Sequence, residues 1–267
     1  MHRIKLCAVA ALVLWLAPLA LTQSEPVPSE SDLAAITARG RLLYEYDQAA
    51  WHSSDAVTAT KPQKETLGRY IAHKTDNQWV VAFGHLNETR DAFVITVLAK
   101  EGKNPQEYSV TKFDSGQSDT GFFLAAARAI EIALQDFHGP ARPYNVAVLP
   151  AQEGKLFVYL VPAQTQDGVY PLGADVRYLF SPDGSAIIEK RQLHKGMIPT
   201  GGPVPPGATI VGGTHSHVLS DVPEDTDVFL VLIRKPSMPE FIATQIAIYE
   251  VNPDGTIKVV QRVKKQH

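Results

Sequence analysis

Hydrophobic and polar positions alternate in short runs along most of the chain. Four runs come early, at residues 69–73, 79–86, 92–98 and 108–113. Short β-branched or aromatic runs separated by turn-forming residues are typical of strands, so these four predict an antiparallel meander. Five more runs follow, at residues 144–150, 156–162, 169–172, 176–180 and 187–193. The turn Ser181-Pro-Asp-Gly184 joins the last two into a predicted hairpin.

Two segments have the period of a helix instead. Residues 120–138 place apolar side chains on one face and stop at Gly139-Pro140. An earlier helix is predicted to start at Ser31 or Asp32, and Gly40 interrupts its period, so the helix is expected to restart there. Strands alternating with two or three helices predict an α+β fold, with largely antiparallel sheets packed against the helices.

The early helix carries an unusual set of side chains. Tyr44, Asp47, Trp51 and His52 follow one another at steps that place them along one side of a helix. One interpretation makes Asp47 and His52 a catalytic pair. The other, which we favour, is a helix that packs its aromatic residues on a sheet and keeps a buried Asp–His hydrogen bond.

The last third of the chain has a proline-rich segment and a second hairpin. Residues 199–207 contain four prolines, which lack backbone donors, so we predict a loop there and no strand. Residues 228–233 are apolar and fit either a helix or a strand. Residues 242–251 and 256–263 flank an Asn-Pro-Asp-Gly turn and predict the last hairpin.

The N-terminus has the pattern of an export signal. His2, Arg3 and Lys5 precede an uncharged apolar run from Leu6 to Leu21, which is shorter than the ~20 apolar residues of a membrane-spanning helix. We therefore predict a signal peptide over residues 1–22 and a polar linker over residues 23–31. The mature protein is expected to be periplasmic or extracellular, with no stable membrane span.

Composition narrows the functional classes. The single cysteine, Cys7, lies inside the predicted signal peptide, so a mature chain has no cysteine nucleophile, disulfide or iron–sulfur cluster. Loss of Arg3 and Lys5 leaves 23 basic against 28 acidic residues, a net charge of −5. This acidic balance without a basic cluster argues against a nucleic-acid partner and leaves a protein or peptide partner open.

The densest chemistry lies in residues 207–227. His215 and His217 are two residues apart, and Asp227 follows ten residues after the second histidine. In a strand, side chains two residues apart point to the same face, so the two imidazoles are able to converge on one cation. The spacing predicts a metal site, against the alternative of two solvated histidines at the end of a strand.

Over roughly residues 170–262, the order of motifs resembles the JAB/MPN (JAMM) metalloprotease-like domains. The matching motifs are Ser-Pro-Asp-Gly, Pro-Pro-Gly-Ala-Thr-Ile-Val-Gly-Gly-Thr-His-Ser-His, Pro-Glu-Asp-Thr-Asp, and a final Asn-Pro-Asp-Gly hairpin. The resemblance implies Zn²⁺ held by His215, His217 and Asp227. Three protein ligands leave a fourth position for a water that zinc activates.

The chain departs from that family at other positions. Glu224 stands where the family has serine, Val218 replaces a proline, and Asp175 occupies the region of the catalytic glutamate, where it is a tentative base. Ser220 or Arg177 would contact the oxyanion or substrate. The alternative metal ligands are Asp221, Glu224 and Asp225. His194 is either a partner that orients a ligand or an ordinary histidine of the hairpin, and we favour the second.

These departures favour an exported cell-envelope protein with a JAMM-like, zinc-binding but non-catalytic domain. The alternatives are a zinc-dependent peptidase or isopeptidase, and a secreted effector or toxin-associated protein. The expected layout is an α+β N-terminal region of unknown type over residues 32–165 and the JAMM-like region over residues 166–267, with a soft boundary near residues 163–168.

Overall fold

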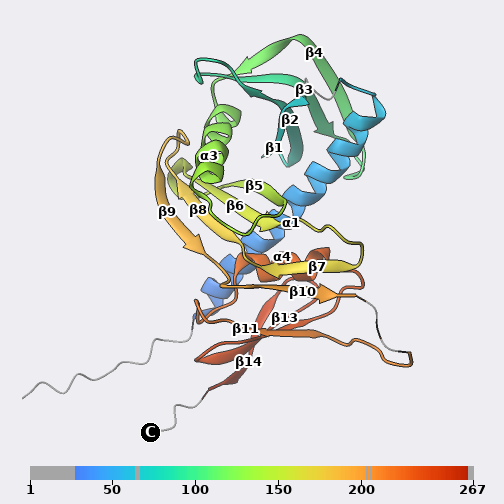
Figure 1. Ribbon diagram of the computed structural model, residues 1–267, viewed down its shortest axis with the longest axis vertical. Coiled ribbons are helices and arrows are strands. Elements are labelled where there is room, and N and C mark those ends of the chain that lie inside the picture. The colour runs from blue at the N-terminus through green and yellow to red at the C-terminus, as the bar shows by residue number, and fades with distance from the viewer. Residues whose placement is uncertain (1–27, 64–66, 203, 205, 264–267) are drawn as a thin grey trace, which may run out of the picture.

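The computed structural model describes residues 28–63, 67–202, 204 and 206–263 (Figure 1). Within these ranges, three α-helices and fourteen mostly antiparallel strands confirm the predicted α+β fold. The predicted signal peptide and residues 23–27 of the predicted linker lie outside the described residues. Over the same ranges, no helix has both the length and the apolar character needed to cross a bilayer.

The first helix, α1 (Glu30–Ala59), begins slightly earlier than predicted. Ser29 is its N-cap: the Ser29 hydroxyl accepts a hydrogen bond from the Asp32 backbone N–H, and the Asp32 carboxylate accepts one from the Ser29 backbone N–H. This reciprocal pair satisfies two donors at the helix start. Asp32, one of the two predicted N-cap residues, thus takes part in the cap from the third position of the helix.

The predicted restart of α1 at Gly40 is wrong, because the helix continues through it without a break. A Cβ at this position would collide with the Val228 side chain and lie 2.6 Å from the Asp225 carbonyl oxygen. Both residues belong to another helix, α4 (Asp225–Ile233). The glycine therefore allows a close approach of α1 and α4, and does not end the helix.

Substitution of Gly40 tests this contact. Helix propensity alone predicts that Gly40→Ala stabilises the protein by about 1 kcal/mol. Because the new methyl group meets α4, we expect the opposite sign, a loss of about 1–3 kcal/mol in the free energy of unfolding measured with urea. Gly196→Ala is the matched control, since a Cβ there meets nothing within 4 Å. A Gly40→Ala variant as stable as the original protein would contradict the close packing.

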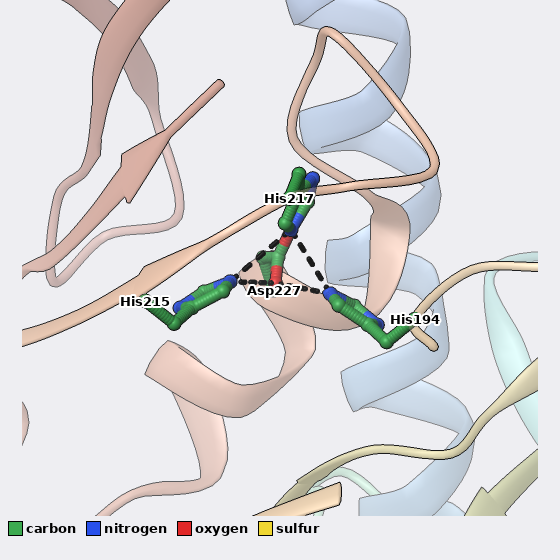
Figure 2. Close-up of side chains that lie close together, drawn as sticks. All are labelled: His194, His215, His217 and Asp227. Carbon is green, nitrogen blue, oxygen red and sulfur yellow. Dashed lines mark hydrogen bonds and ion pairs between the residues drawn. The ribbon is translucent and has the colours of Figure 1, made fainter. Parts of the chain in front are cut away.

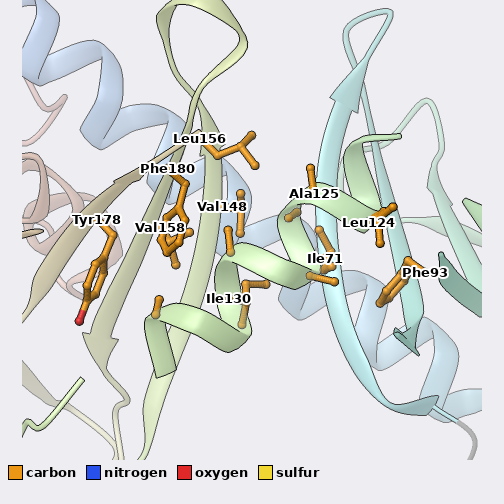
Figure 3. Packing of buried hydrophobic residues seen from close by; sticks show 14 of the residues in the cluster. Ile71, Phe93, Leu124, Ala125, Ile130, Val148, Leu156, Val158, Tyr178 and Phe180 are labelled. Atoms are coloured by element: carbon orange, nitrogen blue, oxygen red, sulfur yellow. The ribbon is translucent and has the colours of Figure 1, made fainter. Parts of the chain in front are cut away.

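The predicted meander forms the first sheet, whose strand order is β1-β2-β3-β4. The strands are β1 (Arg69–Thr75), β2 (Gln78–Leu86), β3 (Phe93–Glu101) and β4 (Tyr108–Asp119). The next helix, α3 (Phe122–Asp136), starts where the Asp119 carboxylate accepts a hydrogen bond from the Phe123 backbone N–H. It lies between this sheet and the next one (Figure 3). Its many buried alanines allow close contact on both sides.

The second sheet has the order β5-β6-β8-β9, with all neighbours antiparallel. Its strands are β5 (Tyr144–Pro150), β6 (Leu156–Pro162), β8 (Val176–Phe180) and β9 (Ile187–Gln192), and a short 3-10 turn, η1 (Gln152–Gly154), joins the first two. Alternate residues of β5 and β6 face α3 and α1. Because β6 pairs with β8, the predicted boundary at residue 165 falls between two strands of one sheet.

A two-stranded ribbon separates this sheet from the last one. Strand β7 (Val169–Gly173) pairs antiparallel with β10 (Met197–Gly201), and Pro199 lies opposite Pro171. The prediction that the proline-rich loop begins at residue 199 is therefore wrong for its first three residues. Both strands of a two-stranded ribbon are edge strands, where proline is tolerated because its missing N–H faces no partner.

The C-terminal sheet has the order β11-β12-β13-β14. Its strands are β11 (Gly213–Ser216), β12 (Glu240–Ala243), β13 (Ala247–Val251) and β14 (Ile257–Arg262). Helix α4 resolves the ambiguous run at residues 228–233 and connects β11 to β12, which are parallel to each other. The apolar side of α4 packs on this sheet together with the start of α1. This arrangement fixes the end of β11 beside the first turn of α4.

Candidate metal centre

Three histidines and one aspartate from separate segments point toward one another (Figure 2). His194 follows β9, His215 lies on β11, His217 comes directly after β11, and Asp227 lies in the first turn of α4. All four are buried, and Asp227 is fully shielded from solvent. We call these four residues the His/Asp cluster.

The donor atoms of the cluster are within contact distance. His217 Nε2 lies 3.0 Å from His194 Nε2 and 3.1 Å from His215 Nε2. Asp227 Oδ1 lies 3.1 Å from Nε2 of both His194 and His215, and its Oδ2 lies 3.2 Å from His217 Nε2. Three ring nitrogens and one carboxylate therefore surround a common point.

The other ring nitrogen of each histidine has its own partner. His194 Nδ1 lies 2.8 Å from Asp175 Oδ1, His215 Nδ1 lies 2.9 Å from Glu240 Oε1, and His217 Nδ1 lies 2.9 Å from the Val222 carbonyl oxygen. These oxygens accept, so each Nδ1 carries the proton in the hydrogen bond. In the neutral imidazole the proton on Nδ1 leaves a lone pair on Nε2, which is the tautomer that a metal ligand needs.

With each proton on Nδ1, the Nε2 lone pairs point toward one another at the centre of the cluster. The His217 Nε2 lone pair lies about 3 Å from the Nε2 lone pairs of both His194 and His215, and these repel unless a proton or a cation lies between them. Partners that hold Nδ1 and orient the ring are a recurring property of histidines that bind metals. The pattern of hydrogen bonds thus favours a cation at the point where the nitrogens meet.

Local structure sets the position of Asp227. It is the third residue of α4, and the Glu224 backbone N–H donates to Asp227 Oδ2 over 2.6 Å, as part of a capping box. A carboxylate at a helix N-terminus is favoured because the free N–H groups and the helix dipole stabilise negative charge. Its other oxygen, Oδ1, remains directed at the histidines.

The pKa values of the cluster follow from its charges. Burial alone would lower the pKa of His194, but Asp227 and Asp175 outweigh it and raise that pKa to about 11. In the same way, burial opposes Asp227 and Glu240 at His215, where the pKa rises to about 9. Burial would raise the pKa of Asp227, yet the histidines hold it well below its usual range. Without a metal, the cluster therefore retains protons that a cation would displace.

Asp175 and Glu224 lie next to the His/Asp cluster with other tasks. Asp175, the tentative base, holds His194 by its Nδ1. Glu224, the N-cap residue of α4, accepts a hydrogen bond from Arg191 Nη2 over 2.5 Å. Burial raises the pKa of Glu224 to about 7, although the nearby Arg191 charge opposes this. Neither carboxylate belongs to the group of side chains that could hold a metal ion.

The other candidates from the sequence point elsewhere. Asp225 binds Arg39 and Arg177, so Arg177 is engaged in an ion pair. The Asp221 carboxylate accepts a hydrogen bond from the Gln245 backbone N–H, and the Ser220 hydroxyl donates to the Val222 carbonyl. The structure brings together His215, His217 and Asp227. It also places His194 among them as a fourth donor, and not as a residue that orients another ligand or as an ordinary histidine of the hairpin.

Sequence reasoning missed the residues that hold His215. Glu240 is buried on β12, one of its oxygens accepts from His215 Nδ1, and the other accepts from Arg234 Nη1 over 2.8 Å. The only available signal was a charged residue beginning an apolar run after Pro239. A buried, paired carboxylate in such a run indicates a structural or ligand-orienting role.

No protein-family model matches the chain, and no curated protein or solved structure matches it either. The resemblance of its motifs to JAMM domains thus stays a prediction from the sequence. What the structure defines is an α+β protein with a buried cluster of His194, His215, His217 and Asp227 that could bind a metal ion.

Proposed function

We propose that this chain is an exported cell-envelope protein in which the His/Asp cluster binds one Zn²⁺ in a non-catalytic, structural site. The observation that carries this proposal is the presence of His194 as a fourth donor beside His215, His217 and Asp227. Structural zinc sites are closed by four protein ligands, whereas catalytic sites keep one position for water or substrate. Export is proposed from the N-terminal sequence pattern alone.

The donor set supports zinc among the divalent ions. Imidazole nitrogens with one carboxylate suit zinc, while calcium and magnesium prefer oxygen ligands. A tetrahedron with bonds of about 2.0–2.1 Å has edges of about 3.3 Å between its donors. Five distances between donor atoms in the cluster, at 3.0–3.2 Å, are close to this value, and all the donor atoms lie within 4.8 Å of one another.

The surroundings of the site support the absence of catalysis. A hydrolytic zinc site needs a general base within reach of the metal-bound water. Asp175, the residue proposed for that role, accepts the Nδ1 proton of His194 at 2.8 Å and is almost fully buried. Its task in the closed site is to orient a ligand.

Metal content and coordination test the proposal. The purified protein, never exposed to chelator, is expected to contain one zinc per chain, and X-ray absorption is expected to show four nitrogen or oxygen neighbours and no exchangeable water. His194→Ala should open one position, which added azide or cyanide then fills. Lack of zinc, or an anion that binds equally well to the unmodified protein, would overturn the closed site.

One observation favours a second candidate, a zinc-dependent peptidase or isopeptidase. A cavity of about 130 Å³ borders His194, His215 and His217, so a small group has access to the metal side of the cluster. In this case one histidine would leave the metal and admit water. Hydrolysis of a peptide panel that stops on zinc removal and returns on zinc addition would establish this function over the first.

A further inference from the structure

Elements α1, β7 and α4 come together in the fold (Figure 1), and residues of all three line a second cavity. Its volume of about 590 Å³ is within the range of sites for small molecules. None of the four residues of the His/Asp cluster lines it, although Asp175, which holds His194, borders both. We call it the α1 cleft.

Aromatic side chains form one wall of the α1 cleft. Tyr44 and Trp51 come from α1, seven residues apart on one face, and Tyr70 comes from β1. Trp51 is 57% exposed, which is unusual for so large an apolar side chain on a helix that contributes to two hydrophobic cores. Aromatic faces exposed in a cleft attract cations and apolar groups.

A carboxylate without a cationic partner lies in the same wall. Asp47, between Tyr44 and Trp51, accepts one hydrogen bond, from Gln48 Nε2 over 3.2 Å, and forms no ion pair with any described residue. The Asp47–His52 hydrogen bond expected from the sequence is absent from the described contacts, since His52 stacks on Trp51 instead. Burial raises the pKa of Asp47, and the Gln48 hydrogen bond opposes this shift.

The side chains that line the α1 cleft carry a net negative charge. Asp167 and Asp175 also border the α1 cleft, and Lys235 is its single basic side chain. Asp175 is already committed to His194. A positively charged ligand is therefore attracted to this lining, in which Asp47 has no cationic partner.

A buried hydroxyl group adds an independent indication of a ligand. Thr226 borders the cleft from α4 and is only 3% exposed, yet its hydroxyl oxygen has no hydrogen-bond partner among the described residues. Buried hydroxyl groups are nearly always paired in native proteins, and an exception calls for an unrecorded partner. A ligand donor or a water held beneath the ligand would supply it.

We infer that the α1 cleft binds a small organic cation, a protonated amine whose charge lies against Asp47 and whose apolar body lies among Tyr44, Trp51 and Tyr70. The inference goes beyond the proposed zinc site and does not depend on it, since no residue that makes these contacts is a metal donor. Loss of the metal would leave it in place.

Three probes of one shape test this inference on the full protein. The probes are 2-phenylethylamine, 2-phenylethanol and phenylacetate, which differ in charge at one end. The amine is expected to bind and to change the fluorescence of the exposed Trp51, the alcohol to bind at least about tenfold more weakly, and the acetate not to bind. Equal affinity for amine and alcohol, or no amine binding up to about 10 mM, would overturn the inference.

Variants on α1 identify the residues involved. Asp47→Asn keeps the shape of the side chain and is expected to weaken amine binding about tenfold or more. Asp55→Asn, which removes the same charge from an exposed position on the same helix, should leave it unchanged. Trp51→Ala, read by calorimetry, should weaken binding about tenfold. Unchanged amine affinity in folded Asp47→Asn protein would contradict the role of Asp47 in binding the cation.

Discussion

Zinc loading is expected to raise the melting temperature of this protein by roughly 8–16 °C when free zinc is a thousandfold above its dissociation constant. A ligand that binds only the folded state at that excess stabilises it by about 4 kcal/mol. For a domain of this size, each 1 kcal/mol corresponds to about 2–4 °C. The measurement is calorimetry of metal-free and zinc-loaded protein. The His/Asp cluster assembles from three segments between residues 194 and 227 that the fold brings together, so the folded chain binds the metal more tightly than the unfolded chain.

The same experiment has a defined pH dependence. In the metal-free protein the pKa of His215 is raised from its ordinary 6.5 to about 9, so its contribution to stability is complete below about pH 6.5 and is lost as the pH rises through about 9. Zinc must displace these protons, so its affinity rises over the same interval. The gap between the two melting temperatures should therefore widen from pH 6.5 toward pH 9.

Two variants separate specific from general effects. His215→Ala removes one donor and is expected to abolish most of the zinc-dependent shift. His85→Ala removes an exposed histidine outside the cluster and should preserve the shift in full. A shift that survives in the His215→Ala protein would mean that zinc binds elsewhere.

The second large effect is expected at Asp225. This fully buried carboxylate accepts from Arg39 Nε over 2.9 Å, from Arg177 Nη1 over 2.6 Å and from the Tyr159 hydroxyl over 2.8 Å. Asp225→Ala would leave the charge of Arg177 buried without a partner, which costs about 3–5 kcal/mol when a buried pair is broken. We expect a loss of this size in the free energy of unfolding, measured with urea.

Glu45→Ala is the matched control for Asp225→Ala. Glu45 pairs with Lys74 at 2.6 Å, but both side chains are at least one third exposed. Exposed pairs contribute about 0–1 kcal/mol, so this variant should remain close to the original stability. Equal losses in the two variants would show that the buried position of Asp225 has no special role.

Much of the fold could be predicted because its signals are local. Alternation within each strand predicts β1 to β4 in sequence, and the periodic alanines and leucines of α3 predict a helix. Gly40 was misread because its reason lies about 185 residues away, where Val228 fills the space of the missing side chain. The apolar run within α4 was ambiguous because its residues are buried almost all round, which removes the period.

In the candidate site, too, the residues close together in sequence were predicted and the more distant ones were not. His215, His217 and Asp227 lie within thirteen residues; strand geometry predicted the convergence of the two histidines, and the resemblance to JAMM domains added Asp227. His194 and Asp175 reach the cluster from the second sheet, and Glu240 reaches it from β12 across the parallel pair. The spacing of these three residues along the sequence follows no helix or strand period, so their contacts could not be predicted before the structure.

The path of α1 has a consequence for how the chain acquires its structure. This helix contributes to two hydrophobic cores, and its first turns pack against Val228, Ile242 and Tyr249, which lie near the other end of the sequence. The first helix of the described residues thus needs the last strands before its apolar face is covered. Such long-range closure slows folding and prolongs the exposure of apolar surface. The export proposed for this chain would separate synthesis from folding and so accommodate this delay.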